Sequence, residues 1–254
     1  MTQETKPFSS TVADTLSQRV TVRFFHEKPI PEQMLQTILE AARRSPTSSN
    51  MQTYSIIVVR DQAVKQQLAV LAGNQKHIET CPVFIAFCAD ISRLEIACEM
   101  HGRSLAKTLE TTLVATVDAA LVGMSAETVA ESFGLGAVMI GGIRNHPREA
   151  AELLGCPPGV YVVYGMCLGW PQEEKVPPQK PRMPDELIIH YESYSTADPR
   201  PLLAQYDEAL AAHYGKQGRN LNRAAYTGVI ANRLDKPSRP HLRNTLEEMG
   251  FRLV

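Results

Sequence analysis

The feature of this 254-residue chain that most restricts its fold is a stretch of about thirty residues, from Ser104 to Phe133, without a proline. The stretch is rich in Ala, Leu, Thr and Val and is interrupted only by Gly123. It predicts either one helix of roughly 45 Å, at about 1.5 Å per residue, or two helices broken near Gly123. Apolar residues surround much of its axis, so we expect a central or interface helix.

Shorter segments on both sides of this stretch alternate between helical and extended patterns. Helices are expected at about 12–16, 29–44, 62–71, 147–154, 202–214 and 242–249, and strands at 54–59, 82–87 and 160–168. Several links are too short for crossover helices, which predicts an α+β fold whose central mixed or antiparallel sheet is flanked by helices. We expect one domain over 1–254, with a core at about 11–184 and a C-terminal arm at about 185–254.

Composition excludes several classes of protein. Twenty-six basic and 27 acidic residues give a net charge of −1, so no global field favours nucleic acid or an acidic membrane. Seven histidines and five cysteines lack ligand-like spacing, so no metal site is expected. The polar first residues are not a signal peptide and no run reaches membrane-spanning length, which predicts a cytoplasmic protein.

The stretch from Arg19 to Phe25 is the first candidate site. Arg19, Thr21 and Arg23 occupy alternate positions, so in an extended chain two guanidinium groups and a hydroxyl share one face. Arginine forks match phosphate oxygens, which favours an anion on that face. The alternative interpretation is an edge strand with a solvated polar face.

A loop rich in hydroxyl and amide groups, Ser45 to Gln52, is the second candidate. Its side chains can hydrogen-bond a heteroaromatic ring or a polyol chain. The alternative is that Ser, Thr and Asn there cap their own backbone.

Two further stretches complete the set. The glycines of 134–142 resemble a dinucleotide motif, but Met139 replaces its third glycine and the order runs from helix to strand, so we reject that reading. Gly141 and Gly142 can still bring bare backbone N–H groups close to a flat ligand. Lys180 and Arg182 flank a proline and form a stiff cationic pair that can close on a phosphate, or else a solvated basic loop.

Together these stretches resemble the nitroreductase family of FMN-dependent oxidoreductases, in its larger NADPH-preferring branch. The resembling segments, in chain order, are Arg19-x-Thr21-x-Arg23-x-Phe25, Ser45-Pro46-Thr47-Ser48-Ser49-Asn50-x-Gln52, Gly73 to His77, Gly134 to Asn145, Leu168-Gly169-Trp170-Pro171 and Lys180-Pro181-Arg182. Thr21 stands where the family usually has Ser. The resemblance runs from about Leu16 to Arg182 and more weakly to the end.

The resemblance implies a nitroreductase-like fold with FMN as cofactor. It places Arg19, Thr21, Lys180 and Arg182 around the FMN phosphate and Arg23 at the pyrimidine end of the isoalloxazine, where it tunes the flavin electrostatically. It places Thr47, Ser48, Asn50 and Gln75 at the ring edge or ribityl chain, and Ile140, Gly141 and Gly142 near N5. No side chain is expected to act as an acid or base, because the flavin carries the hydride.

The resemblance also implies a homodimer with two flavins at the subunit interface and exchanged helices and C-terminal arms. Arg219 and Arg223 are candidate NADPH contacts, but Gln217 lies where an Arg is expected, which leaves NADH as a second candidate donor.

The resemblance predicts ping-pong transfer of hydride from NADPH through FMN to a nitroaromatic, a quinone or a similar small acceptor. A flavin reductase that supplies reduced FMN, and a flavin-binding protein without turnover, are the alternatives.

Overall fold

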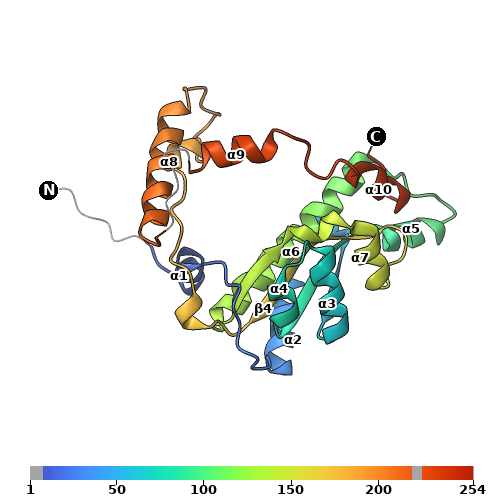
Figure 1. Ribbon diagram of the computed structural model, residues 1–254. Helices are drawn as coiled ribbons and strands as arrows, with labels where there is room; N and C mark the ends of the chain where they lie inside the picture. Colours follow the sequence, from blue (N-terminus) through green and yellow to red (C-terminus); the bar gives the residue numbers. More distant parts are fainter. Residues whose placement is uncertain (1–7, 219–224, 254) are drawn as a thin grey trace. The chain divides into compact units, whose positions relative to one another are not determined.

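The computed structural model describes residues 8–218 and 225–253. The chain divides into two compact units, one of residues 1–177 with 241–254 and one of residues 178–240 (Figure 1). The first unit holds the sheet and most helices.

The sheet of the first unit has four strands in the order β1-β2-β4-β3. Their bounds are β1 Tyr54–Val59, β2 Val83–Asp90, β3 Gly136–Ile140 and β4 Val160–Gly169. Every neighbouring pair is antiparallel, with Ile57 opposite Ala86, Ala86 opposite Gly165 and Val138 opposite Cys167. The expected α+β class with an antiparallel sheet is confirmed. β3 lies where the glycines of 134–142 were expected to lead from a helix into a strand, and it ends directly before Gly141 and Gly142.

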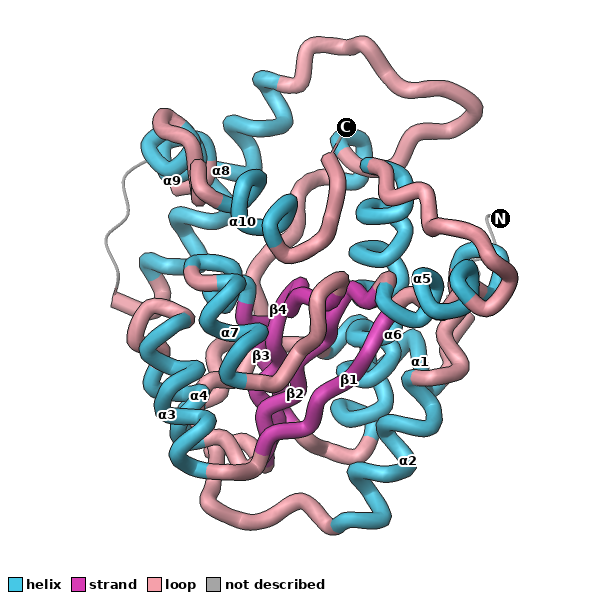
Figure 2. The backbone as a smooth tube through the Cα atoms, turned by 90° about the vertical axis from the view of Figure 1, so that its right-hand side faces the viewer, coloured by secondary structure: helices cyan, strands magenta, loops and turns pink. Residues whose placement is uncertain are grey.

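Helices cover both faces of this sheet (Figure 2). α2 (Glu32–Ala42) and α6 (Leu109–Ser132) pack on one face, and α3 (Gln62–Leu71), α4 (Lys76–Thr80) and α7 (Pro147–Leu153) pack on the other. Side chains of β2 alternate between the two cores: Ile85 and Phe87 join the α6 side, and Phe84 and Ala86 join the α3 side. The apolar run of β2 is therefore buried on both faces.

α6 is one unbroken helix, which settles the two alternatives for the proline-free stretch. Gly123 lies inside this continuous helix, and a residue without a Cβ is needed there because the hydroxyl of Tyr164 occupies the space that a Cβ would fill. That hydroxyl donates hydrogen bonds to the carbonyls of Ala119 and Ala120. By length and composition α6 could cross a membrane, but it also carries two buried carboxylates, Asp118 and Glu127, as the core helix of a globular domain can.

Several short helices surround this frame. α1 (Thr11–Gln18) precedes the Arg19 stretch and buries no residue, and α5 (Ser92–Glu99) follows β2. Single 3-10 turns lie at Ser48–Asn50, Gly141–Asn145 and Glu173–Lys175. Sequence patterns did not predict α4 or α5, since five residues are too few for a periodic signal and α5 buries none of its residues.

The second unit contains a 3-10 turn at Asp185–Leu187, α8 (Arg200–Gly215) and α9 (Thr227–Leu234). Asp207 of α8 is buried and accepts hydrogen bonds from the backbone N–H groups of Tyr226 and Thr227 at 2.6 and 2.9 Å, which joins the two helices. α10 (Leu242–Glu248) belongs to the first unit, where Phe251 packs edge-on against Tyr161. The expected C-terminal arm thus covers most of the second unit, which begins at residue 178, and a final segment, 241–254, that belongs to the first unit.

Candidate functional site

The Arg19 to Phe25 stretch lies along the outer edge of β3. The Val22 N–H donates to the Ala137 carbonyl at 2.9 Å, and Thr21 forms a parallel bridge with Ala137. Gly136 makes this approach possible, because a Cβ at that position would lie 2.7 Å from the Cβ of Val22. Val22 and Phe25 are buried, so the stretch is fixed by two apolar anchors.

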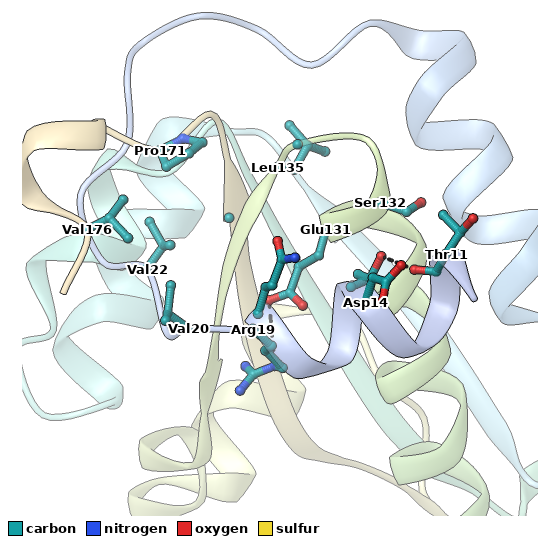
Figure 3. Close-up of a pocket in the computed structure, with 14 residues that line it drawn as sticks. Thr11, Asp14, Arg19, Val20, Val22, Glu131, Ser132, Leu135, Pro171 and Val176 are labelled. Atoms are coloured by element: carbon teal, nitrogen blue, oxygen red, sulfur yellow. Dashed lines mark hydrogen bonds and ion pairs between the residues drawn. The ribbon is translucent and has the colours of Figure 1, made fainter. Parts of the chain in front are cut away.

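The two arginines of this stretch line different cavities. Arg19 is bonded to Glu127 and lies 3.6 Å from Glu131, both on α6, beside a cavity of about 380 Å³ (Figure 3). Arg23 is exposed and lines a second cavity of about 780 Å³. The expectation that both guanidinium groups present one common face is therefore not met, because α6 attracts Arg19 with two carboxylates.

These carboxylates shape the local electrostatics. Burial lowers the pKa of Arg19, but the hydrogen bond and charge of Glu127 outweigh it and leave the pKa raised. Burial, with the nearby charge of Glu127, raises the pKa of Glu131 to about 7, against a smaller lowering by Arg19. Glu131 therefore exchanges its proton near neutral pH.

Gly141 and Gly142 follow β3 directly, and Ile140, the last residue of that strand, is buried. A Cβ on Gly142 would lie 2.4 Å from Nε2 of Gln75 and 2.5 Å from the carbonyl oxygen of Ala72. The Gln75 amide is held in place because it donates to that same carbonyl at 2.7 Å. Three of the predicted site residues, Gln75, Gly141 and Gly142, thus form one neighbourhood at the end of β3.

Arg23 extends this neighbourhood through His77, the second residue of α4. Burial, and then the charge of Arg23, lower the pKa of His77, so its imidazole is neutral at pH 7. The Nε2 atom of His77 is buried and has no hydrogen-bond partner within residues 8–218 and 225–253.

The Ser45 to Gln52 loop is anchored to α6. Asp118, which is 1% exposed, accepts hydrogen bonds from the backbone N–H of Ser48 at 3.2 Å and from both the N–H and hydroxyl of Thr53. Ser49, Asn50 and Gln52 have positive φ angles of 47°, 56° and 52°, a conformation unfavourable for residues other than glycine. Such backbone strain occurs often at ligand sites.

The side chains of this loop divide between the two interpretations. Ser45 bonds its own backbone, as the capping alternative states, since its hydroxyl donates to the Ala42 carbonyl at 2.7 Å. Asn50 Oδ1 accepts from the Gln52 amide at 3.2 Å. In the part of the chain that the structure describes, the hydroxyls of Thr47 and Ser48 make no hydrogen bond, and neither caps the backbone of its own loop.

The loop and the Arg19 stretch lie at opposite edges of the sheet. The loop leads into β1, whereas the Arg19 stretch flanks β3, at the other end of the order β1-β2-β4-β3. From β1 to the Arg19 stretch there are four steps across the sheet, three between neighbouring strands and one from β3 to the stretch. At about 4.8 Å per step this distance is about 19 Å. α6 gives a similar scale, since Asp118 and Glu127 are nine residues or about 14 Å apart along its axis. One chain therefore does not bring Thr47, Ser48 and Asn50 to Thr21.

The remaining predicted residues lie in the second unit or outside the residues that the structure describes. Lys180 lies with its Nζ 5.6 Å from the centre of the Tyr214 ring, and the charge of Arg182 acts on the neighbouring Tyr206 hydroxyl. Gln217 lies 2.8 Å from His213 through its side-chain amide. Arg219 and Arg223 are outside the described residues.

Three of the residues that organise the site, Asp118, Glu127 and His77, were assigned no role from the sequence. Asp118 and Glu127 are carboxylates within an apolar stretch predicted to be buried, and that contrast was the available signal. His77 lies in a segment that resembles the nitroreductases, yet nothing in its spacing indicated a role.

Comparison with known proteins agrees with this architecture. The model of the nitroreductase family matches residues 16–170, and the model of the family's C-terminal domain matches residues 180–254. An oxygen-insensitive NADPH nitroreductase of Salmonella typhimurium is 40% identical over 91% of this chain and 93% of its own length. An FMN reductase [NAD(P)H] of Bacillus subtilis is 35% identical over 95% of this chain and 98% of its own.

Solved structures show the same likeness. NfrA2 of B. megaterium superimposes with a TM-score of 0.92 and 33% identity, covering 97% of this chain and 100% of its own. The α+β fold with its antiparallel sheet is thus the nitroreductase fold. The chain belongs to the nitroreductase family.

Proposed function

We propose that this chain is an FMN-dependent NAD(P)H oxidoreductase that passes hydride to a small-molecule acceptor such as a nitroaromatic or a quinone. The observation that carries the proposal is the junction at the end of β3. There the Arg-x-Thr-x-Arg stretch is hydrogen-bonded to β3, and β3 is followed directly by Gly141 and by Gly142, against which Gln75 packs. The names of the related NADPH nitroreductase and FMN reductase support the same activity.

The residues present suit FMN in chemistry and in space. Gly142 leaves no room for a side chain beside Gln75, so backbone N–H and a fixed amide can approach a flat ring. Arg23 is close to the same neighbourhood, because its charge acts on His77, two residues after Gln75. Bound FMN would supply the chemistry, which is to accept two electrons as hydride and to donate them again.

The protein's own groups bind and tune this cofactor. We assign the phosphate to Arg19, Thr21, Lys180 and Arg182, because guanidinium and ammonium groups suit a dianion. Glu127 and Glu131 already interact with Arg19, so its charge is partly neutralised before a phosphate binds. Arg23 places a positive charge where the reduced ring becomes anionic, which favours reduction.

We further propose a homodimer, because one chain leaves this site incomplete. Thr47, Ser48 and Asn50 lie at the sheet edge opposite to Thr21, so they serve a flavin only when a second copy supplies them. α6 carries an exposed apolar stripe, Leu109, Leu113, Val117, Leu121 and Met124, that a second copy would cover. We place this dimer in the cytoplasm.

The electron donor is proposed to be NADPH, with NADH as the competing donor. Arg219 and Arg223 remain the proposed contacts for its phosphate, and Gln217 is the residue that weakens the preference. If arginines contact the additional phosphate of NADPH, salt should screen that attraction. The ratio of kcat/KM for NADPH to kcat/KM for NADH should then fall as the salt concentration rises.

Two alternatives share the same site. A flavin reductase would turn over free FMN with a lower KM than nitrofurans, whereas a nitroreductase would show the reverse. A flavin-binding protein without turnover would hold FMN at full occupancy and be bleached by NADPH only slowly.

The assignment of residues is tested by flavin content and reduction rate in single variants. Arg182→Ala should lower FMN affinity about tenfold or more, because it removes a charge-assisted hydrogen bond worth roughly 1.5–3 kcal/mol. Arg23→Ala should retain FMN but slow its reduction. Full FMN content in Arg182→Ala, or normal reduction in Arg23→Ala, would refute the corresponding placement.

A further inference from the structure

A second cavity, of about 780 Å³, opens beside Arg23 and is separate from the cavity at Arg19. Cations outnumber acids in its lining. Arg23, Lys65, Lys76 and Lys175 face two carboxylates, Glu27 and Glu79, which leaves an excess of two positive charges. His77 also lines the cavity.

Lys65 of α3 is the unusual member of this lining. It is 4% exposed, and its Nζ donates to the carbonyl of Cys81 at 2.6 Å. No carboxylate pairs with it among the described residues. A carbonyl satisfies one of its three N–H donors but does not neutralise its charge, and an unpaired buried charge is costly.

The rim of the cavity supplies further donors. Arg23 and Lys76 are exposed and form no hydrogen bond or ion pair with residues 8–218 and 225–253. The neutral imidazole of His77 presents a buried Nε2 that has no partner in the same ranges. Phe24, which is 53% exposed, forms an apolar wall of the same cavity, and the Nζ of Lys175 lies 5.3 Å from the centre of its ring. Unpaired cations above an apolar wall suit an organic anion better than a hydrated inorganic ion.

We propose that this cavity binds a small organic oxyanion, an aromatic molecule that carries a phosphate or carboxylate group. Lys65 lies at the base as the charge partner, Lys76 contacts the anion from the rim, and Phe24 contacts the aromatic ring of the ligand. Arg23 belongs both to this cavity and to the proposed flavin site, so the two ligands would lie next to each other. The binding itself requires no turnover and stands apart from the activity proposed above.

The test is titration calorimetry of the full-length protein in saturating FMN, so that any flavin phosphate site is filled. Phenyl phosphate and benzoate are the probes and separate the two sources of oxyanion, and benzyl alcohol is the uncharged control. We expect saturable binding of at least one anion and none of the alcohol. Absence of saturable binding by both anions would overturn the proposal.

Variants locate the binding. Lys76→Ala, on the exposed rim, should weaken the bound anion about tenfold or more. Lys65→Met should do the same, because it removes the charge and keeps an unbranched side chain only one atom shorter. Lys236→Ala, an exposed lysine of the other unit, is the matched control and should bind as the wild type does. Equal affinity in Lys76→Ala and wild type would overturn the proposal even if Lys65→Met does not fold.

Flavin content separates this proposal from the proposed function. Lys76→Ala should retain the FMN content of the wild type and lose only the anion. A protein without FMN would contradict the proposed oxidoreductase, yet the two anion probes would still report on this cavity.

Discussion

The Arg19 guanidinium is bonded to the Glu127 carboxylate, which joins the end of α1 to the C-terminal third of the core helix α6. The Glu127 side chain is 2% exposed and that of Arg19 is 19% exposed, so the pair is largely withdrawn from water. A buried pair of this kind is weak evidence for stability in itself, but the loss of one partner leaves the other charge uncompensated.

Arg19→Met should therefore lower the free energy of unfolding by about 3–5 kcal/mol, because it leaves Glu127 buried without its partner. The double variant Arg19→Met/Glu127→Leu should regain most of this loss. Chemical denaturation of the single and double variants measures both. Additive losses in the double variant would show that the pair is not coupled.

Glu131 makes stability fall with rising pH. Its pKa is raised to about 7 in the folded protein from 4.5, so the folded state binds the additional proton between these values. Stability should decrease as pH rises from about 4.5 to about 7, by roughly 3 kcal/mol, and level off above. Glu131→Gln should flatten this slope in denaturation at pH 5, 6, 7 and 8. If stability depends on pH in the variant as it does in the wild type, a group other than Glu131 is responsible for the pH dependence.

Gly142→Ala should reduce FMN affinity and also lower the free energy of unfolding, because the added Cβ meets backbone as well as a side chain. The added Cβ would meet the Gln75 amide at 2.4 Å and the Ala72 carbonyl at 2.5 Å, so Gln75 must leave its position. Flavin fluorescence during dialysis measures the affinity. The matched control is Gly215→Ala, where no atom lies within 4 Å of the new Cβ. Equal FMN binding in the two variants would contradict the placement of Gln75.

The apolar stripe of α6 should control oligomeric state. Leu113 and Val117 are 51% and 53% exposed, so changing both to Glu should leave the fold intact, convert dimer to monomer and lower FMN content. Sedimentation velocity measures this. Ile96→Glu, at a residue of α5 that is 56% exposed, is the control and should stay dimeric. A Leu113→Glu/Val117→Glu protein that keeps the wild-type mass would exclude this stripe from the interface.

The sequence predicted the fold well wherever local pattern decides structure. The strand at Tyr54–Val59 and the helix at Gln62–Leu71 have the predicted bounds, because apolar runs and caps are local signals. The sequence left open whether Gly123 breaks α6, since the answer depends on Tyr164, 41 residues later. α9 also escaped prediction, because it buries none of its residues and so has no core-facing pattern.

The candidate site was predictable in its residues but not in their arrangement. The alternation at Arg19, Thr21 and Arg23 indicated one shared face, yet Glu127 on a distant helix attracts Arg19 away from Arg23. Periodicity within a strand contains no information about such partners. For the same reason the sequence could not show that the Ser45 to Gln52 loop lies across the sheet from Thr21.

The measurement that tests the central claim most directly is an absorbance spectrum of the purified protein, followed by anaerobic addition of NADPH and then NADH. We predict a yellow protein with one FMN per chain whose flavin absorbance is bleached rapidly by NADPH, with the NADH rate showing the effect of Gln217. A colourless protein that takes up no added FMN would contradict the account.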